Sequence, residues 1–400
     1  MFCSLGFFVA ASSSIHAENT PRELRILIGR VSERSGKDFS FEGQALMDAQ
    51  GKPVRNDNVV CRRELAIASP LLSSEIASDS GVRWRCRAAP HTWSVKGSLR
   101  FTDRSGFFKI GKTWYRGALE LVERDNALWI VNAVDVEAYL AGLLHGEMPR
   151  DFEAEALKAQ AIAARSYAVA TALERRASGA IYDLTDNTRD QMYPGAQTES
   201  KKGDLAVLAT AGEYLSIGRK ILKSFYHAAS GGHSELPSNV WAAARARSEH
   251  EAFATQPNPW DKGDYAWSMS LSPEIFARFP ELGEIVDVRV SKRSEGFRVQ
   301  QLRLIGTQSE KELTVRELER IFGPAWIKSR KFEIVKEGRT WKILGEGWGH
   351  GVGLSQVAAN KMAKAGKSYR QILEFHYPKA VITKLKDAGA GKLLAGPNAR

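Results

Sequence analysis

The stretch that decides the fold is VDVEAYLAGLLHGEMPRDFEAEALKAQAIAARSYAVATALERRA, which occupies residues 134–177 of a 400-residue chain. Before it, residues 96–134 carry short strand-like runs separated by the turns DRSG and ERDN, so this part is predicted to be rich in β-strands. Inside it the apolar period becomes that of a helix, with Tyr139, Leu140 and Leu143 on one stripe. The sequence therefore predicts an α+β protein, in which a β-rich N-terminal region precedes a mixed α/β core.

Two helices are predicted within this stretch. Because proline breaks a helix, Met148-Pro149 ends the first helix directly after Glu147. Asp151 is a suitable N-cap for the second helix, and Gly179 is a typical residue at its end. The second helix is rich in alanine, which lets neighbouring elements approach closely, so we expect it to be buried on several sides.

The other elements are predicted from apolar period, turn residues and caps. Residues 31–95 contain many Gly, Pro and Ser residues and are predicted to be irregular, and residues 181–242 to be loop and strand. The remaining predicted elements are strands at about 22–30, 285–290, 297–305 and 332–344, a helix at 314–322 with a capping box from Thr314 to Glu317, and two helices joined at Gly366.

The start of the chain resembles a leader. Residues 1–17, MFCSLGFFVAASSSIHA, are similar to a secretory signal peptide, although a positively charged start is missing. No later segment has the ~20 apolar residues of a membrane helix, so we expect an exported protein of the periplasm or cell envelope with no transmembrane helix in the mature chain. The expected parts are a β-rich region at 18–130, a core domain at 131–380 with an α/β section at about 265–345, and a tail at 381–400.

Charge and cysteine content limit the partners and the compartment. The formal charge is +11, from 57 basic and 46 acidic residues, which suggests an acidic polymer or surface as partner. The basic residues form no arm or stripe, and no nucleic-acid-binding motif is present, so we expect no nucleic acid partner. Cys61 and Cys86 remain after removal of the leader, and a disulfide and a pair of free thiols are both consistent with the sequence.

A second unusual stretch is GEGWGHGVG, residues 345–353, which has glycine at every second position. In an extended backbone the glycines would share one face, and Glu346, Trp348 and His350 would share the other. A phosphate loop is excluded because the terminal Gly-Lys-Ser/Thr is missing, and a dinucleotide fingerprint is excluded because Val352 replaces its last glycine. A flat glycine face beside an indole and an imidazole suits a saccharide ring, and a close approach of two backbones is the alternative.

Glu147 and the turn SGGH are further candidates for chemistry. Glu147 lies at the end of an apolar helix, where the dipole and apolar neighbours raise the pKa of a carboxyl group. A carboxyl that stays protonated near neutral pH is the general acid that glycosidic cleavage requires, and a solvated helix-end glutamate is the alternative. Ser230 and His233 lack the nucleophile-elbow motif, so we expect them either to hydrogen-bond a polar ligand or to form an ordinary turn.

Several stretches together resemble the stage II sporulation protein D family of peptidoglycan lytic transglycosylases. These are GEMP, EALKAQAIAARSYA, DNTRDQMYPG, FYHAASGGHSE and GWGHGVGLSQVAANKMAKAGKSYRQILEFHYP, in the family's order across about residues 130–380. The resemblance implies cleavage of the MurNAc–GlcNAc bond in glycan strands, preferably strands stripped of stem peptides, by Glu147 in a groove surrounded by helices. One carboxyl group then suffices, because the sugar's own C6 hydroxyl attacks C1 and leaves a 1,6-anhydro end.

The motifs also suggest which residues line the groove. They are His350, Ser230, His233, Gln191, Tyr193, Gln356, Trp348, Lys158 and Arg165. Lys158 and Arg165 lie seven residues apart on one helix face, where they contact substrate, orient the glutamate or form structural salt bridges.

No cofactor is expected, and two other functions stay open. Some family members bind zinc through Cys and His in the loop where this chain has Thr185, Arg189 and Asp190. A metallohydrolase that uses His350 and His376 is a distant hypothesis, because their spacing matches no tight metal motif. The family also includes amidase enhancers, so a wall-binding protein that stimulates a separate amidase is the second hypothesis.

Overall fold

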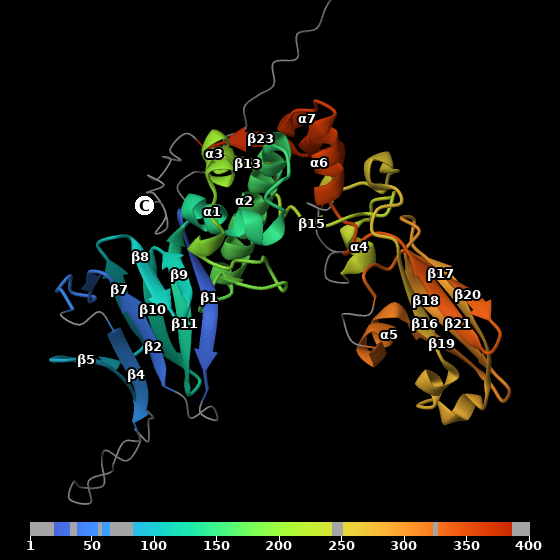
Figure 1. Ribbon diagram of the computed structural model, residues 1–400, viewed down its shortest axis with the longest axis horizontal. Coiled ribbons are helices and arrows are strands. Elements are labelled where there is room, and N and C mark those ends of the chain that lie inside the picture. Colours follow the sequence, from blue (N-terminus) through green and yellow to red (C-terminus); the bar gives the residue numbers. More distant parts are fainter. Residues whose placement is uncertain are drawn as a thin grey trace, which may run out of the picture.

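The computed structural model describes residues 20–32, 38–54, 58–64, 83–241, 251–322 and 327–385. The expected signal peptide and most of the expected tail lie outside these ranges. Figure 1 shows a β-rich part coloured blue to cyan, a helical part in green and red, and a smaller β-rich part in orange. The fold is α+β, as predicted.

The N-terminal part contains two six-stranded sheets. Its strands are β1 (Glu23–Val31), β2 (Phe39–Gly43), β3 (Leu46–Met47), β4 (Asn58–Glu64), β5 (Arg83–Ala88), β6 (His91–Val95), β7 (Ser98–Asp103), β8 (Phe107–Ile110), β9 (Thr113–Arg116), β10 (Ala118–Arg124), β11 (Ala127–Asp135) and β12 (Leu184–Thr185). One sheet has the order β12-β1-β11-β10-β7-β3, and the other has the order β6-β5-β4-β2-β8-β9. Phe41 of one sheet packs on Phe101 of the other, with ring centroids 4.9 Å apart, so the sheets share a core.

The expectation that residues 31–95 are irregular is wrong, because β2 to β6 lie there. In β5 the buried Trp84 and Cys86 alternate with arginines, which is the period of a strand with one buried face. Cys86 lies opposite Cys61 of β4, and the two residues form a disulfide. Of the two alternatives for the cysteines, the disulfide is therefore the one observed.

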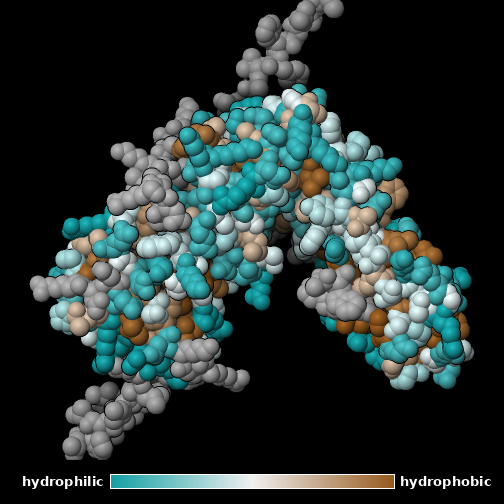
Figure 2. All heavy atoms as spheres, in the orientation of Figure 1, coloured by the Kyte–Doolittle hydropathy of each residue, from teal (hydrophilic) through white to brown (hydrophobic). Residues whose placement is uncertain are grey.

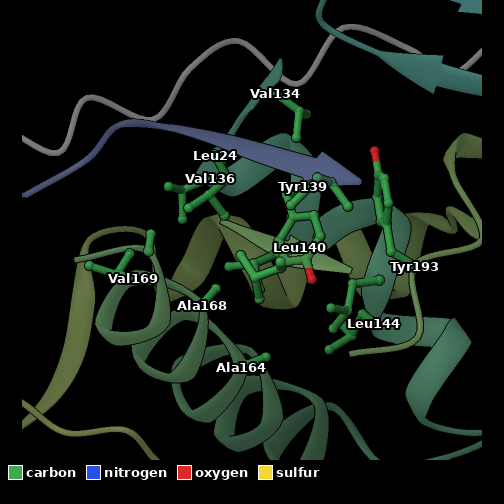
Figure 3. Packing of buried hydrophobic residues seen from close by; sticks show 14 of the residues in the cluster. Leu24, Val134, Val136, Tyr139, Leu140, Leu144, Ala164, Ala168, Val169 and Tyr193 are labelled. Atoms are coloured by element: carbon green, nitrogen blue, oxygen red, sulfur yellow. The ribbon is translucent and has the colours of Figure 1, made fainter. Parts of the chain in front are cut away.

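The helical part is built around α1 (Val136–Glu147) and α2 (Ala154–Ala177), both as predicted. Figure 3 shows Tyr139 and Leu140 of α1 above Ala164 and Ala168 of α2. All four side chains are fully buried, because the small alanines let the two helices pack closely.

The start of α2 differs from the prediction. Asp151 does not cap it; the N-cap is Glu153, whose side chain makes no capping hydrogen bond. Instead, the backbone N–H of Glu153 donates to Oδ1 of Asn360 at 2.8 Å. Asn360 belongs to α6 (Gln356–Lys364), which is followed by α7 (Tyr369–His376), and both helices were predicted. The start of α2 is thus fixed by a contact about two hundred residues away, which no local pattern reveals.

A third helix, α3 (Lys201–Ala209), was missed in the region expected to be loop and strand. Its N-cap is Ser200, whose hydroxyl accepts from the backbone N–H of Gly203 at 3.1 Å. Within the described residues, no helix is long and apolar enough to cross a membrane.

The small β-rich part has its own core. It contains β16 (Trp267–Leu271), β17 (Ile285–Arg293), β18 (Val299–Gly306), β19 (Glu310–Thr314), α5 (Val315–Phe322), β20 (Phe332–Glu337) and β21 (Thr340–Gly345). The strands form two three-stranded sheets that enclose Leu302, Leu304 and Trp341. The predicted strand at 332–344 is a hairpin of β20 and β21, and the predicted capping box from Thr314 to Glu317 is confirmed.

Short strands connect the glycine run to the helical part. β15 (Tyr226–His227) pairs in parallel with β22 (Leu354–Ser355), so the segments FYHAASGGHSE and GEGWGHGVG lie side by side. In Figure 2 the two β-rich parts form separate lobes below the helical part.

Candidate functional site

Glu147 is the last residue of α1, and its side chain is partly buried. Its Oε1 accepts a hydrogen bond from the backbone N–H of Met192 at 2.6 Å, and the Tyr226 hydroxyl bonds to the same carboxyl group. Burial raises the pKa of Glu147, and these two hydrogen bonds oppose the rise. The carboxyl group is therefore biased toward its protonated form while the residue still reaches solvent.

Gln191 decides how the Tyr226 hydroxyl is oriented. The Gln191 amide nitrogen faces the carbonyl oxygen of Ala164 at 3.2 Å, which can only accept a hydrogen bond. The same nitrogen also donates to the Tyr226 hydroxyl at 3.0 Å, and the Gln191 carbonyl accepts from the Tyr139 hydroxyl at 3.0 Å. The Tyr226 oxygen thus accepts from Gln191 and keeps its own proton for Glu147. Burial holds the pKa of Tyr226 well above its ordinary value, so this proton stays in place.

The glycine run lies against residues 225–235. The expectation of an extended strand with one bare face is wrong beyond Gly345. Four of its glycines have positive φ: Gly347 (79°), Gly349 (102°), Gly351 (80°) and Gly353 (71°). A Cβ at Gly353 would lie 2.1 Å from the carbonyl oxygen of Phe225, so the two backbones approach as closely as glycine allows.

His350 supports Tyr226 from within this run. Its Nδ1 accepts from the backbone N–H of Val352 at 3.0 Å, and the ring also hydrogen-bonds the backbone carbonyl of Tyr226. The ring packs on Trp241, with centroids 4.9 Å apart. Burial lowers the pKa of His350 to about 3, so the imidazole is neutral near pH 7. Both ring nitrogens are thereby engaged, and the side chain holds the backbone of Tyr226 in place.

Ser230 belongs to a buried hub centred on Asp261. Ser230 and Asp261 are both 0% exposed. The Asp261 carboxylate accepts from the Ser230 hydroxyl and the Ser230 backbone N–H, both at 2.6 Å, and from the Gly232 N–H at 2.9 Å. The Ser355 hydroxyl donates to it at 2.6 Å. The hub therefore ties the SGGH turn to the segment after the glycine run, and Ser230 has no hydroxyl proton left for a ligand.

His233 lies at the surface side of the same turn. Its ring packs on Phe297, with centroids 4.9 Å apart, and its Nδ1 bonds the carbonyl oxygen of Ser234 at 3.0 Å. The turn beneath it is anchored by the buried Arg298, which donates to the carbonyl oxygens of His233 and Ser230 at 3.0 and 2.9 Å. Burial lowers the pKa of Arg298 to about 10, which leaves the guanidinium charged.

Two other candidates are buried in structural contacts. The Tyr193 hydroxyl donates to Asn132 at 3.0 Å inside the core. Arg165 is 0% exposed and makes a bidentate ion pair with Glu137, with bonds of 2.9 and 2.6 Å. For Arg165 the structure thus shows the salt bridge among the open alternatives.

The last three candidates differ in exposure. Lys158 pairs with Glu155 of its own helix at 2.6 Å. Gln356 is 7% exposed at the start of α6, and Trp348 is 47% exposed. Of the sequence-predicted residues, the structure brings Gln191 and, through Tyr226, His350 to Glu147. Tyr226 was missed, although the motif that contains it was identified.

The loop at Thr185 is held by hydrogen bonds. The Asp190 carboxylate accepts from the Thr185 backbone N–H at 2.8 Å and pairs with Arg175 at 2.9 Å. Among the described residues, no group of three or more His, Cys, Asp or Glu is arranged to hold a metal ion.

Comparison with known proteins identifies the helical part. A family model described as Stage II sporulation protein matches residues 124–216, which include Glu147 and Gln191. Residues 124–216 therefore carry a domain of the stage II sporulation protein family, and curated relatives named stage II sporulation protein D match the chain. A second model, described as Domain of unknown function (DUF8618), matches residues 272–353, which span most of the small β-rich part and the glycine run.

Curated relatives cover most of the chain at modest identity. Stage II sporulation protein D of Bacillus subtilis is 28% identical over 283 residues, covering 66% of this chain and 79% of the relative. An uncharacterized protein of Brachyspira hyodysenteriae is 29% identical over 297 residues, covering 70% and 75%. The amidase enhancer of Bacillus subtilis is 26% identical over 292 residues, covering 61% of this chain but 40% of the relative.

Proposed function

We propose that this protein acts on the bacterial cell wall as a lytic transglycosylase that cleaves the MurNAc–GlcNAc bond of peptidoglycan glycan strands. One observation carries the proposal: Glu147 is a partly buried carboxyl group with a raised pKa, held by the Met192 N–H and the Tyr226 hydroxyl. The activity then belongs in the periplasm or cell envelope, where the polymer is found.

The protonated Glu147 gives its proton to the glycosidic oxygen, so the leaving sugar departs as an alcohol. The C6 hydroxyl of the same MurNAc then attacks C1, and the ionised Glu147 takes the proton from that hydroxyl. The product is a 1,6-anhydro end, no water is consumed, and Glu147 returns to its starting state. The Tyr226 hydroxyl and the Met192 N–H stabilise the carboxylate between the two steps.

A single carboxyl group fits this chemistry better than hydrolysis. Glycosidases that use water need a second carboxylate about 5 to 9.5 Å from the first. The groups that hydrogen-bond the Glu147 carboxyl group are a backbone amide and a phenol. The sugar's own hydroxyl supplies the nucleophile instead.

The second candidate is a wall-binding protein without catalysis, which stimulates a separate amidase. The observation that favours it is the similarity to the amidase enhancer. A pure binding protein has no need of a carboxyl group with a raised pKa, so the environment of Glu147 favours the enzyme.

The test digests intact and amidase-stripped peptidoglycan strands with the wild type and with Glu147→Gln. Mass spectrometry detects anhydro-MurNAc ends, which we expect from the wild type, in larger amount on stripped strands. Glu147→Gln keeps the shape of the side chain and lacks the titrating proton, so it should release anhydro ends far more slowly than the wild type. Anhydro ends at the wild-type rate from this variant would refute the role of Glu147, and stimulation of an added amidase by both proteins without anhydro ends would favour the binding hypothesis.

A further inference from the structure

Two exposed aromatic side chains stand beside the glycine run. Trp348 is 47% exposed and Tyr265 is 46% exposed, and their rings are perpendicular with centroids 5.7 Å apart. We call them the aromatic pair. The Nζ atom of Lys328 lies 5.0 Å from the centroid of the Trp348 ring, which places a cation on this surface. Large rings grouped at a surface are typical of a binding site, because apolar area is otherwise withdrawn from water.

The backbone around this surface is in an unusual conformation. Tyr265 has φ of 51° and Phe297 has φ of 61°, in the left-handed region that bulky residues rarely adopt. The other non-glycine residues with positive φ in the described chain are Asp125 and Asn126, whose types tolerate it in a turn. Strained residues of this kind cluster at ligand sites. Here the strain presents two aromatic rings to solvent, since Phe297 is 55% exposed.

A depression of about 720 Å³ lies on the small β-rich part. The aromatic pair does not line it, but the lining residues Ala266 and Glu346 are one and two residues away from Tyr265 and Trp348 along the chain. Exposed Leu344, Val335 and Phe297 give it apolar surface, and Figure 2 shows apolar atoms at the surface of this lobe.

Ion pairs border the same depression. Lys331 pairs with Glu346 at 2.8 Å, and Arg293 pairs with Glu333 at 2.6 Å. All four residues line the depression. A pyranose ring has apolar C–H faces and a rim of hydroxyl groups, so aromatic and aliphatic surface flanked by charged donors and acceptors matches it.

The aromatic pair is connected to the region of Glu147. The backbones of Trp348 and Ala229 exchange hydrogen bonds at 2.9 and 3.1 Å. Ala229 is three residues after Tyr226, so the Cα atoms of Ala229 and Tyr226 are at most about 10 Å apart. A polymer on the aromatic pair therefore lies within reach of Glu147.

We propose that the aromatic pair, Lys328 and the adjoining depression form a second saccharide-binding site, which holds the glycan strand away from the bond that is cleaved. The proposal rests on the proposed function for its ligand. Lys328 makes no ion pair within the described part of the chain, and a cation there suits the carboxylates that muramyl sugars carry when their peptides are removed. The site makes the protein prefer long strands over short fragments.

The experiment measures binding in the Glu147→Gln protein, so that it does not depend on cleavage. The probes are peptide-free glycan strands sorted by length, and neutral chitin oligosaccharides of the same lengths. Trp348→Ala and Tyr265→Ala should each weaken binding of the longest strands roughly tenfold, the loss of about one aromatic contact, and leave the shortest fragment unchanged. Trp348→Phe should retain most of the affinity. Lys328→Gln should weaken binding of muramyl strands only.

Leu205→Ala is the matched control, because Leu205 is 58% exposed on α3, outside the depression. Equal affinity of the wild-type and both aromatic variants for long strands overturns the proposal, as does an equal loss with the Leu205 variant. If the wild type releases no anhydro ends but long strands still bind through Trp348, the proposed reaction fails and the second site stands. If cleavage is normal and the aromatic variants bind equally well, the site fails and the reaction stands.

Discussion

Two carboxyl groups, those of Asp261 and Glu147, have opposite surroundings. Asp261 is 0% exposed and accepts four hydrogen bonds, from Ser230 twice, from Gly232 and from Ser355. Glu147 is partly exposed and accepts bonds from one backbone N–H and one phenol. Every donor around Asp261 belongs to the protein, whereas Glu147 keeps part of its hydrogen-bonding capacity for another molecule. The difference separates a carboxylate that holds the fold from one that is available for chemistry.

The largest expected effect is on the rate of glycan cleavage. Glu147→Gln should lower the rate of glycan cleavage by roughly 10³-fold or more, because a general acid typically contributes 10²- to 10⁴-fold and here the same group is also the base. The rate of anhydro-MurNAc release measures this. A loss smaller than tenfold would mean that Glu147 is not the acid. Glu147 and Asp261 would then not differ in their part in catalysis.

The same variant tests the raised pKa through stability. The folded state binds the Glu147 proton more tightly than the unfolded state, because the pKa is raised on folding. The resulting stability is present below the unfolded pKa and is lost as pH rises through the folded pKa. Glutamine has no such loss, so Glu147→Gln should gain stability relative to the wild type as pH increases. Thermal unfolding of both proteins from pH 4 to 8, about the range around a carboxyl pKa, measures it.

Asp261→Asn should lose much stability, in contrast to the gain expected for Glu147→Gln. The asparagine nitrogen would face donors, which leaves several buried groups without an acceptor at about 1–3 kcal/mol each. We expect a decrease of about 3–4 kcal/mol in the free energy of unfolding, measured by urea denaturation. Normal stability in this variant would show that the hub does not hold the two segments together.

A third comparison is between Gly351 of the glycine run and Gly366 outside it, which have almost the same φ. Gly351 has φ of 80°, and a Cβ there would lie 1.9 Å from the Arg298 guanidinium, whereas Gly366 has φ of 81° and nothing within 4 Å. Gly366→Ala should cost about 1 kcal/mol for its backbone conformation alone. Gly351→Ala should cost roughly 3 kcal/mol, because it also displaces a buried cation. Equal losses by urea denaturation would contradict the close approach to Arg298.

Much of the helical part could be predicted from local pattern. The apolar period and Met148-Pro149 locate α1 and its end, so Glu147 could be identified as a helix-end carboxyl. The strands β2 to β6 were missed because their runs are short, although in β5 arginines alternate with the buried Trp84 and Cys86 as in a strand with one buried face. Helix α3 was missed because its signal is a single serine cap on nine residues.

The roles of the motif residues depend on contacts that no local pattern contains. Ser230 was expected at a ligand, but Asp261, thirty-one residues later, takes its hydroxyl proton. For His350 the sugar contact stays a prediction, and the contact that the structure adds is its hydrogen bond to the backbone of Tyr226, next to the parallel pairing of β15 with β22. The Tyr226 hydroxyl is oriented by its hydrogen bonds with Gln191 and Glu147, which come from two other segments. Motifs therefore located the site, and tertiary pairing decided which member touches the carboxyl group.

The smallest effect concerns Tyr226, which donates to Glu147. Tyr226→Phe removes the hydroxyl that donates to Glu147 and leaves the backbone that His350 holds. That bond lowers the pKa of Glu147, so without it the pKa rises further and the acid stays protonated to higher pH. We expect the rate of cleavage at its optimum to fall roughly tenfold, because the carboxylate formed between the two steps loses one donor. The descending limb of the pH–rate profile should move to higher pH. A loss of rate with an unchanged profile would mean that Tyr226 acts on the sugar and not on Glu147, and the oriented proton described above would then serve the substrate.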